Sequence, residues 1–465
     1  MTILKIQNTL ENSKEVFDPI DSKNVRVYAC GPTVYNYAHI GNARMAVVND
    51  VLIRLLRLIY PKVTYVSNIT DIDDKIIESA NNQNIEIKTL TRKFEKIYNE
   101  DMSALGVENP DKQPRASEHI NEMIELTKKL LDNKNAYEKD GHVLFHVPSF
   151  KNYGCLSKRN REEQIMGSRV EVAPFKKDPT DFVLWKPSSK NMPGWDSPWG
   201  FGRPGWHLEC SAMSEKTLGL PFDIHSGGMD LTFPHHENEI AQTCSAHNQN
   251  DNPKFFAKYW FHNGFVIVDG EKMSKSIGNI RLVNDLIKRY SGETLRLTLL
   301  SAHYRQPLNW TTDSIDQTNT MLTRLYRSLH EIKNIKININ KASVPENVMN
   351  ALCDDLNTPK ALAELNLMVN KLSGASLDEQ KKLKEGILAS GKVIGILQNN
   401  PEKWLRYGIA ESLDNQSIKK LIKDRNEARR KKDFALADKI RNELKNKGIE
   451  IEDTKEGTLW RSIKN

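Results

Sequence analysis

The sequence predicts an α/β protein: a parallel-sheet domain split by an insertion, then a helical bundle and a small α/β domain at the C-terminus. Two observations near the N-terminus support the first part of this prediction. Residues 25–30 and 63–66 have the pattern of strands, and residues 41–60 between them repeat apolar side chains every third or fourth position. Because a strand, a helix and a strand in succession form a βαβ unit, we expect the two strands to pair in parallel.

Further predicted strands follow much later in the chain, at residues 222–225, 259–262 and 265–268. We expect residues 1–75 and 205–270 to be the two halves of one sheet-based domain, with residues 76–204 inserted between them. Beyond the sheet the pattern is mostly helical, and we expect a helical bundle over residues 342–405. Residues 411–465 are expected to form the small α/β domain, since a helix pattern there is followed by a strand pattern.

The composition is that of a globular protein with several domains. A chain of 465 residues is too long for one compact core, and its 38% apolar and 27% charged residues are ordinary proportions. No run of about 18 apolar residues occurs and the N-terminus lacks a secretory pattern, so we expect no membrane span. Five cysteines, an odd number, argue against a disulfide framework and favour reduced thiols in the cytoplasm.

Positive charge gathers towards the C-terminus. The formal net charge is +7, and residues 411–465 hold 15 Lys/Arg against 11 Asp/Glu, which is +4 of that excess. Such an excess suits a polyanionic partner such as RNA, through contacts with its phosphates. A solvated helix face would account for the same charges equally well, so composition alone leaves both alternatives open.

The first candidate phosphate-binding motif is His39-Ile40-Gly41-Asn42, between the first predicted strand and its helix. A helix N-terminus attracts phosphate because its N–H groups are unpaired and its dipole is positive there. His39 and Asn42 can donate hydrogen bonds to the triphosphate of ATP, and Gly41 lets the backbone approach the nucleotide. Alone this motif is weak evidence, because a histidine and a glycine at a helix start usually form only a turn.

The second motif, Lys272-Met273-Ser274-Lys275-Ser276, carries more information. Two lysines and two hydroxyls in a glycine-flanked loop suit a mobile clamp on a pyrophosphate leaving group. The alternative is a solvated loop, but a chance match at five positions is rare. The residues that we assign to catalysis are His39, Asn42, Lys272 and Lys275, and those that we assign to ATP binding are His39, Gly41, Asn42 and Lys275.

The two motifs, in this order on opposite halves of a split sheet, resemble those of the class I aminoacyl-tRNA synthetases. In that family the motifs read HIGH and KMSKS; the second is intact here, and the first ends in Asn42 in place of histidine. The resemblance implies a Rossmann-type catalytic domain that adenylates an amino acid, releases pyrophosphate and transfers the amino acid to the terminal ribose of a tRNA. It also implies that residues 271–333, which include the KMSKS loop, contact the tRNA stem.

Three separated segments supply candidate metal ligands. Cys30 ends the first predicted strand, Cys210 lies in a second segment, and His235 and Glu239 lie in a third. Two thiolates, one imidazole and one carboxylate form a good ligand set for Zn²⁺. Buried cysteines with a hydrogen-bonded core histidine are an equal alternative, and Cys244 is a rival ligand.

Spacing within the third segment distinguishes its two histidines. Pro234 suits a helix start, so His235 and Glu239, four residues apart, face the same way. His236 has Ile240 at the equivalent position, and isoleucine offers no ligand. The spacing therefore favours His235 together with Glu239.

Five stretches of the chain closely resemble the cysteinyl-tRNA synthetase family, and the resemblance runs from about residue 3 to residue 461. They are residues 30–35, 68–75, 209–213 and 235–239, and the C-terminal stretch that runs from 437–441 through 457–461. The resemblance implies that one zinc ion per chain is bound by Cys30, Cys210, His235 and Glu239. It also implies a substrate pocket that contains Thr70, Trp206, His225 and Asp230.

The implied function is activation of L-cysteine with ATP, accompanied by Mg²⁺, and transfer to the 3′-terminal ribose of tRNA(Cys). We expect a monomer with no membrane partner, in which residues 411–465 bind the anticodon. Zinc would explain the choice of amino acid, because a pocket that relies on shape separates near-isosteres such as cysteine and serine by only ~10–200-fold. A coordinating thiol, in contrast, is deprotonated by Zn²⁺.

Three alternatives share parts of this pattern. A mycothiol-pathway ligase joins cysteine to an amino sugar but lacks a tRNA-reading C-terminal domain, whereas here about 190 residues follow Lys275, including basic residues from Arg425 to Lys432. An inactive RNA-binding homologue is disfavoured by the intact second motif. A methionine-type synthetase is disfavoured because the cysteines occur singly and not in C-x-x-C pairs.

Overall fold

The computed structural model describes residues 3–167, 174–189, 192–274, 276–339, 342–405, 415–446, 449–454 and 457–462. The chain divides into two compact units. The first unit contains residues 1–315, 345–364 and 393–395, and the second contains residues 316–344, 365–392 and 396–465. Among the described residues, no helix has the length and apolar character that a membrane span requires.

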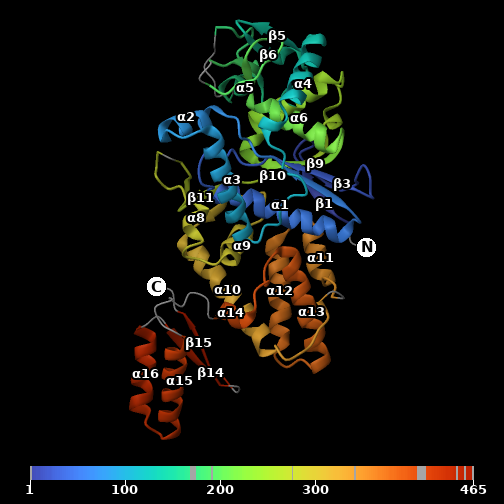
Figure 1. Ribbon diagram of the computed structural model, residues 1–465. Helices are drawn as coiled ribbons and strands as arrows, with labels where there is room; N and C mark the ends of the chain where they lie inside the picture. Colours follow the sequence, from blue (N-terminus) through green and yellow to red (C-terminus); the bar gives the residue numbers. More distant parts are fainter. Residues whose placement is uncertain are drawn as a thin grey trace. The chain divides into compact units, whose positions relative to one another are not determined.

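A parallel sheet lies at the centre of the first unit (Figure 1). Over the described residues its strands follow the order β10 (Ala257–Asn263), β9 (Phe222–Gly228), β3 (Val25–Ala29) and β4 (Val63–Ser67). Each neighbouring pair is parallel. These parallel pairs confirm the predicted α/β class. The sheet is also divided by the insertion, since β3 and β4 precede it and β9 and β10 follow it.

Helix α1 (Ile40–Ile59) connects β3 to β4 and completes the predicted βαβ unit. Its side chains Val47, Val51 and Leu55, four residues apart, are fully buried, which explains the apolar period of the sequence. The helix stops before Tyr60, whose backbone is extended. The proline that follows Tyr60 disfavours a helical conformation in the residue before it.

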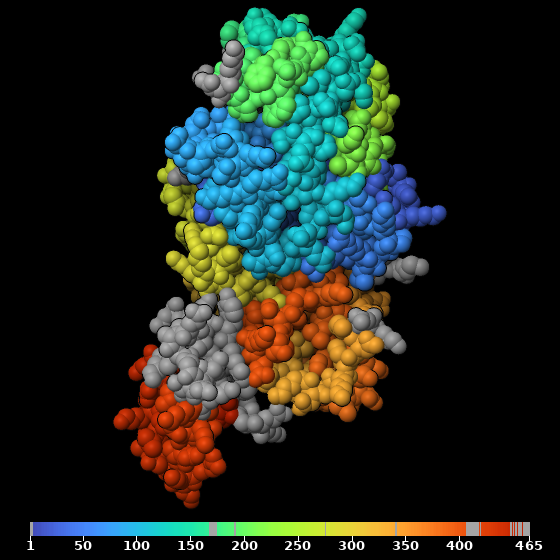
Figure 2. Space-filling model, in the orientation of Figure 1, coloured from blue at the N-terminus to red at the C-terminus, as the bar shows by residue number. Residues whose placement is uncertain are grey.

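The insertion carries an antiparallel sheet of its own, in the order β5 (Ala136–Lys139), β6 (His142–Phe145), β7 (Phe182–Pro187) and β8 (Gly202–Pro204). The helical segments around it are α2 (Asp74–Gln83), α3 (Ile87–Ala104), η1 (Ala116–Glu118), α4 (Ile120–Asp132), η2 (Val147–Ser149) and α5 (Arg161–Gly167). Figure 2 shows that α2, α3 and α4 form much of the surface on this face of the first unit.

The second half of the main sheet brings further helical segments, which are α6 (Trp206–Leu218), η3 (Met229–Leu231), η4 (Thr232–His236), α7 (Glu237–Ala246) and η5 (Pro253–Phe255). The hairpin of β1 (Lys5–Asn8) and β2 (Ser13–Val16) precedes the sheet in the sequence. Strand β9 is buried along its whole length, as expected for a parallel strand that is covered on both faces.

The strand predicted at residues 265–268 forms, but outside the main sheet. It is β11 (Val266–Val268), which pairs with β12 (Glu271–Lys272) and with β13 (Leu308–Trp310). The chain changes partner at Gly264, whose N–H donates to Tyr304 O over 2.8 Å. A Cβ at Gly264 would lie 2.6 Å from Arg305 O, so this close approach requires glycine.

The remaining elements are mostly helices. They are α8 (Val283–Leu286), α9 (Gly292–Leu300), α10 (Thr312–Glu331), α11 (Glu346–Cys353), α12 (Thr358–Leu372), α13 (Leu377–Ile394), α14 (Pro401–Leu405), α15 (Asn415–Arg430), α16 (Phe434–Asn446), β14 (Ile449–Thr454) and β15 (Gly457–Ser462). Strands β14 and β15 form an antiparallel hairpin, so residues 415–462 combine two helices with two strands.

A buried ion pair holds α1 against α9. The guanidinium of Arg296 contacts the carboxylate of Asp50, and both side chains are almost fully buried. Asp50 also accepts hydrogen bonds from Arg54 Nε over 2.7 Å and from the backbone N–H of Glu108 over 2.8 Å. Arg296 Nε donates to Ile394 O over 2.8 Å. Removing one charge of such a pair leaves the other uncompensated.

We expect Asp50→Asn to lower the free energy of unfolding of the first unit by about 3–5 kcal/mol, because Arg296 would keep a buried charge without its counter-ion. Chemical denaturation followed by tryptophan fluorescence measures the loss. The matched control is Asp354→Asn, which breaks an exposed pair with Lys14 and should cost less than about 1 kcal/mol. Equal losses in the two variants would show that burial does not strengthen the Asp50 pair.

Candidate active site

The candidate site lies at the carboxyl ends of β3, β4 and β9. Strand β4 lies on one side of β3 and β9 on the other, so the order of strands reverses there, which is where parallel α/β sheets bind ligands. Cys30 follows β3, Thr70 follows β4, and His225 lies within β9. Helices α6 and α7 contribute Cys210 and Glu239.

Four buried side chains, those of Cys30, Cys210, His235 and Glu239, meet at this place. Cys30 Sγ lies 3.6 Å from Cys210 Sγ and 3.8 Å from Glu239 Oε1. The same Glu239 oxygen lies 3.0 Å from His235 Nε2. Donors around a tetrahedral Zn²⁺, with bonds of about 2.0–2.3 Å, are separated by roughly 3.3–3.8 Å. The two distances from Cys30 Sγ lie in this range and the distance between His235 and Glu239 is shorter. The cluster therefore suits metal binding, and its donor types are ones that zinc takes in proteins.

Burial of this cluster disfavours charge on its members. It raises the pKa of the Cys30 thiol and of the Glu239 carboxyl well above their usual values, and it lowers the pKa of His235 well below its usual value. The forms that bind a metal are the thiolate, the carboxylate and the neutral imidazole. A divalent cation would stabilise the two anionic forms here, because it would compensate charges that are removed from water.

His235 is held in the orientation that a ligand requires. Its Nδ1 lies 2.9 Å from His207 Nδ1, and its Nε2 faces Glu239. Trp206 stacks on the His235 ring, with 4.1 Å between the ring centroids and 14° between the planes. A hydrogen bond to the second ring nitrogen commonly supports a metal-binding histidine.

A second set of four donors overlaps the first. Cys30, His225, His236 and Glu239 also have ligand atoms within 4.8 Å of one another. The spacing argument set His236 aside, yet its Nε2 lies 3.2 Å from Cys30 Sγ. Spacing within one helix could not predict this contact, because Cys30 lies 206 residues away in the sequence.

Two of the four predicted substrate-pocket residues, His225 and Trp206, contact candidate metal donors, and a third, Thr70, contacts Glu209, the neighbour of Cys210 in the sequence. Thr70 Oγ1 donates to Glu209 Oε2 over 3.0 Å, and both residues are buried. His225 Nε2 lies 2.8 Å from Glu239 Oε2. Trp206 covers the ring of His235 and is itself 36% exposed, so it lies between the cluster and solvent.

His39 and Asn42 form a reciprocal cap at the start of α1. His39 Nδ1 accepts from the N–H groups of Gly41 and Asn42 over 3.1 and 3.3 Å, and Asn42 Oδ1 accepts from the His39 N–H over 3.1 Å. Since Nδ1 is an acceptor, a neutral ring carries its proton on Nε2. Burial lowers the pKa of His39, and the charge of Asp230 partly opposes this effect. Asp230, the fourth predicted pocket residue, therefore lies near the ATP motif.

The second motif begins in β12 and continues into a loop. Ser274 N–H donates to Asn279 Oδ1 over 2.9 Å, and Asn279 Nδ2 donates to Lys272 O over 3.2 Å, so Asn279 closes the loop on itself. The side chain of Lys272 is exposed. Lys275, which the sequence assigns to ATP and catalysis, lies outside the described residues.

Main-chain hydrogen bonds join the start of α1 to the segment that follows the second motif. Ile40 N–H donates to Arg281 O over 3.0 Å, and Val283 N–H donates to Ala38 O over 2.9 Å. A Cβ on Gly41 would lie 3.5 Å from Met273 Cε, so the loop covers the helix start. Sequence patterns could not reveal this bridge, because backbone groups form it whatever their side chains are.

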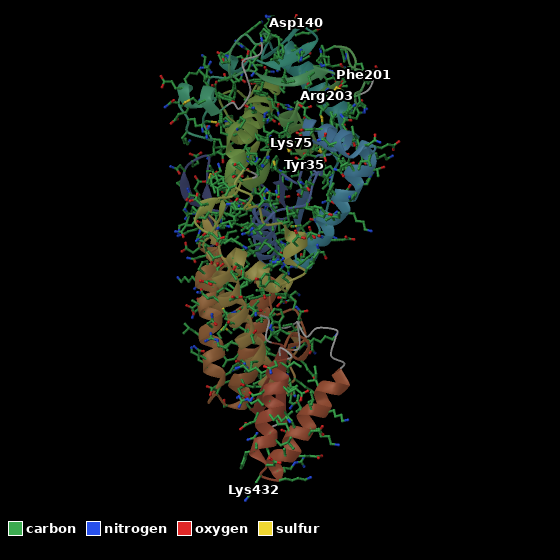
Figure 3. The ribbon with its side chains drawn as sticks, turned by 90° about the vertical axis from the view of Figure 1, so that its left-hand side faces the viewer. Tyr35, Lys75, Asp140, Phe201, Arg203 and Lys432 are labelled. Atoms are coloured by element: carbon green, nitrogen blue, oxygen red, sulfur yellow. The ribbon has the colours of Figure 1, made fainter. Side chains whose placement is uncertain are left out.

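The C-terminal basic residues divide into paired and exposed groups. Arg425 is 6% exposed and makes two 2.8 Å hydrogen bonds to the carboxylate of Asp453, which Arg429 also contacts. These arginines hold α15 to β14. Arg430, Lys431 and Lys432, which follow, are exposed, and Lys432 lies at the tip of the α15–α16 hairpin (Figure 3).

Three family models match the chain. The model described as tRNA synthetases class I (C) catalytic domain matches residues 16–320. The DALR domain matches residues 347–398, and the cysteinyl-tRNA ligase anticodon binding domain matches residues 415–461.

Curated relatives match over nearly the whole length. The cysteine–tRNA ligase of Parvibaculum lavamentivorans is 52% identical over 461 residues, which are 98% of this chain and 97% of that protein. The cysteine–tRNA ligase of Rhodospirillum rubrum is 52% identical over 462 residues, with 98% of this chain and 99% of that protein covered.

Solved structures share the fold at low identity. A methionyl-tRNA synthetase from Mycobacterium tuberculosis, in complex with methionyl-adenylate, has a TM-score of 0.57 at 15% identity and covers 82% of this chain and 93% of its own. A leucyl-tRNA synthetase complex from Agrobacterium radiobacter has a TM-score of 0.58 at 11% identity, with 83% and 85% covered. Together with the motifs and the full-length relatives, these matches show that the chain belongs to the cysteinyl-tRNA ligase family of class I aminoacyl-tRNA synthetases.

Proposed function

We propose that this chain activates L-cysteine with ATP and transfers the cysteinyl group to the 3′-terminal ribose of tRNA(Cys). The observation that carries this proposal is the buried cluster of Cys30, Cys210, His235 and Glu239. It lies beyond β3, the strand that also leads to the His39 motif at the start of α1. A site that combines a thiol-binding centre with an ATP-binding helix start suits adenylation of cysteine.

The cluster is proposed to hold one zinc ion per chain. When bound, the ion supplies a Lewis acid that lowers the pKa of a coordinating thiol, so that cysteine is recognised as its thiolate and the less acidic serine hydroxyl is not. The protein itself supplies shape and orientation: Trp206 stacks on His235, and Thr70 and His225 are held by buried carboxyl groups. Shape alone would separate the two amino acids by only ~10–200-fold.

In the activation step the carboxylate of cysteine attacks the α-phosphorus of ATP, and the bond from that phosphorus to the leaving pyrophosphate breaks. The N-terminus of α1 and the Nε2–H of His39 are proposed to donate to the phosphates. Lys272 and Lys275, together with Mg²⁺ that accompanies ATP, are proposed to stabilise the pyrophosphate. The backbone bridge at residues 281–283 supports this arrangement, because it keeps the base of the lysine loop beside α1.

The tRNA is proposed to contact residues 271–333 through its stem and residues 411–465 through its anticodon. Exposed cations on the C-terminal hairpin suit phosphate contacts. We also propose that the enzyme acts as a monomer in the cytoplasm, where its cysteines, all unpaired, would remain reduced. The alternative function, joining cysteine to an amino sugar as in the mycothiol pathway, would give a product without tRNA.

Purified protein is expected to hold about one zinc per chain by elemental analysis. In ATP–pyrophosphate exchange with each of the twenty amino acids, cysteine should exceed serine by more than the ~200-fold that shape can give. Removing the metal with a chelator should abolish exchange with cysteine, and added zinc should restore it. Metal-free enzyme that keeps its preference for cysteine would refute the role of the metal.

Lys275→Ala should lower cysteine-dependent pyrophosphate exchange by roughly 10²–10³-fold, because the lysine stabilises charge that develops on the leaving group. Binding of cysteine, measured by calorimetry, should change little. The control is Lys96→Ala, since this lysine on α3 is 77% exposed and far from either motif in the sequence. Parallel losses of binding and exchange in Lys275→Ala would contradict a role confined to the leaving group.

A chain that ends at residue 410 should retain pyrophosphate exchange and charge tRNA more weakly, because the residues proposed to bind the amino acid and ATP all lie within residues 1–315 of the first unit. The two rates, measured on the same preparation, separate activation from tRNA recognition. The prediction is wrong if kcat/KM for tRNA is the same in the shortened and the full chain.

A further inference from the structure

A line of hydrogen bonds leads away from the thiol of Cys30. His236 Nε2 lies 3.2 Å from Cys30 Sγ, and His236 Nδ1 lies 2.8 Å from His262 Nε2. His262 Nδ1 then lies 2.7 Å from Thr9 Oγ1. The two histidines are buried, whereas Thr9, just after β1, is half-buried. Four residues from four separate segments thus form one continuous path from the candidate metal cluster.

We propose that Thr9, His262 and His236 are positioning residues: they fix a single direction of hydrogen bonding, in which His236 donates to the metal-bound thiolate of Cys30 and is not itself a ligand. This inference rests on the proposed metal at Cys30. It assigns a role to three side chains that take no part in the mechanism described above.

The direction of hydrogen bonding along the path follows from its Cys30 end. A cysteine that binds a metal is a thiolate and has no proton to give, so a hydrogen bond between Cys30 Sγ and His236 Nε2 has His236 Nε2–H as its donor. A neutral imidazole carries one N–H only, so His236 Nδ1 must accept, from His262 Nε2–H. By the same rule His262 Nδ1 must accept, and the hydroxyl of Thr9 is then the donor. Full burial keeps both rings neutral, since an isolated charge would be costly there.

The surroundings hold His236 in the pose that this role needs. Gly227 of β9 lies against the ring, and a Cβ at that position would be 2.7 Å from His236 Cε1 and 3.1 Å from Nε2. The ring of Trp260 packs nearby, with 5.3 Å between its centroid and that of His236. The ring therefore has room only because residue 227 lacks a side chain.

The direction also chooses between the two overlapping donor sets. Both sets contain Cys30 and Glu239 and differ in their other two members. A histidine whose Nε2 carries a proton cannot bind a metal through that atom, and its Nδ1 is engaged by His262. The proposed direction therefore assigns the metal to the set that includes Cys210 and His235. If His236 Nε2 bound the metal instead, the ring proton would lie on Nδ1 and every hydrogen bond of the path would run the other way. Partners that hydrogen-bond to ligands typically alter metal affinity by 10–100-fold.

The test compares Thr9→Val, which keeps the shape and removes the hydroxyl, with Thr9→Ser, which keeps the hydroxyl. Zinc affinity of each full-length chain is measured by competition with a chromophoric chelator. Thr9→Val should bind zinc about tenfold more weakly than wild type, and Thr9→Ser should match wild type. Both variants keep the backbone hydrogen bond from Thr9 N–H to Trp260 O, so neither substitution removes this main-chain contact of the fold.

A second measurement determines the direction of hydrogen bonding along the path. Nitrogen-15 spectra of the histidine rings in zinc-loaded protein should show His236 and His262 with their protons on Nε2, and Thr9→Val should change the His262 signal. Equal zinc affinity in the two Thr9 variants, or a proton on His236 Nδ1, would overturn the inference while leaving the metal centre in place. Wild-type protein that binds no zinc would overturn the proposed metal centre itself.

Discussion

The parallel pairing of β3 with β9 is the contact on which the site depends. About 190 residues separate the two strands, so closing that loop costs roughly 5 kcal/mol of chain entropy. Burial offsets this cost, because Phe222 and Ile224 of β9 are fully buried and each contributes about 1.5–3 kcal/mol. The hydrogen bond from Cys30 N–H to Ser226 O then sets the first proposed metal donor beside the strand that carries His225. Without this pairing, the donors would remain on separate segments.

Acidic side chains are buried around the site, and among the described residues most of their carboxylate oxygens have a hydrogen-bond partner, although Glu209 Oε1 has none. Glu237 accepts from the N–H groups of Leu156 and Ser157 over 3.3 and 2.8 Å, which ties the insertion to α7. Glu209 and Glu239 are likewise fully buried. An unsatisfied buried polar group costs about 1–3 kcal/mol, so these bonds are needed for folding as well as for shape. Metal binding to Glu239 would therefore stabilise the folded chain, since the donors meet only there.

Features that lie within one element could be predicted from the sequence. Strands β3 and β4 and helix α1 were located within a residue or two, because alternation and helical period are local signals. The four proposed metal donors could be named because thiols and imidazoles near strand ends are conspicuous. The path from Thr9 through His262 to His236 could not be, since its members lie up to 253 residues apart and share no period. The partner of β11 was missed for the same reason: pairing with β13 depends on how the chain turns at Gly264.

The two candidate ATP motifs are anchored in the fold in different ways. The reciprocal cap of His39 and Asn42 sets the helix start, and an amide oxygen at position 42 serves this cap as an acceptor. The lysine loop is fixed at both ends, by β12 on one side and by the bridge at residues 281–283 on the other. Gly270, with a φ of 84°, provides a turn at the loop base that other residues rarely adopt. The described residues of the loop are thus held at both of its ends, next to the helix start that we propose to bind the phosphates.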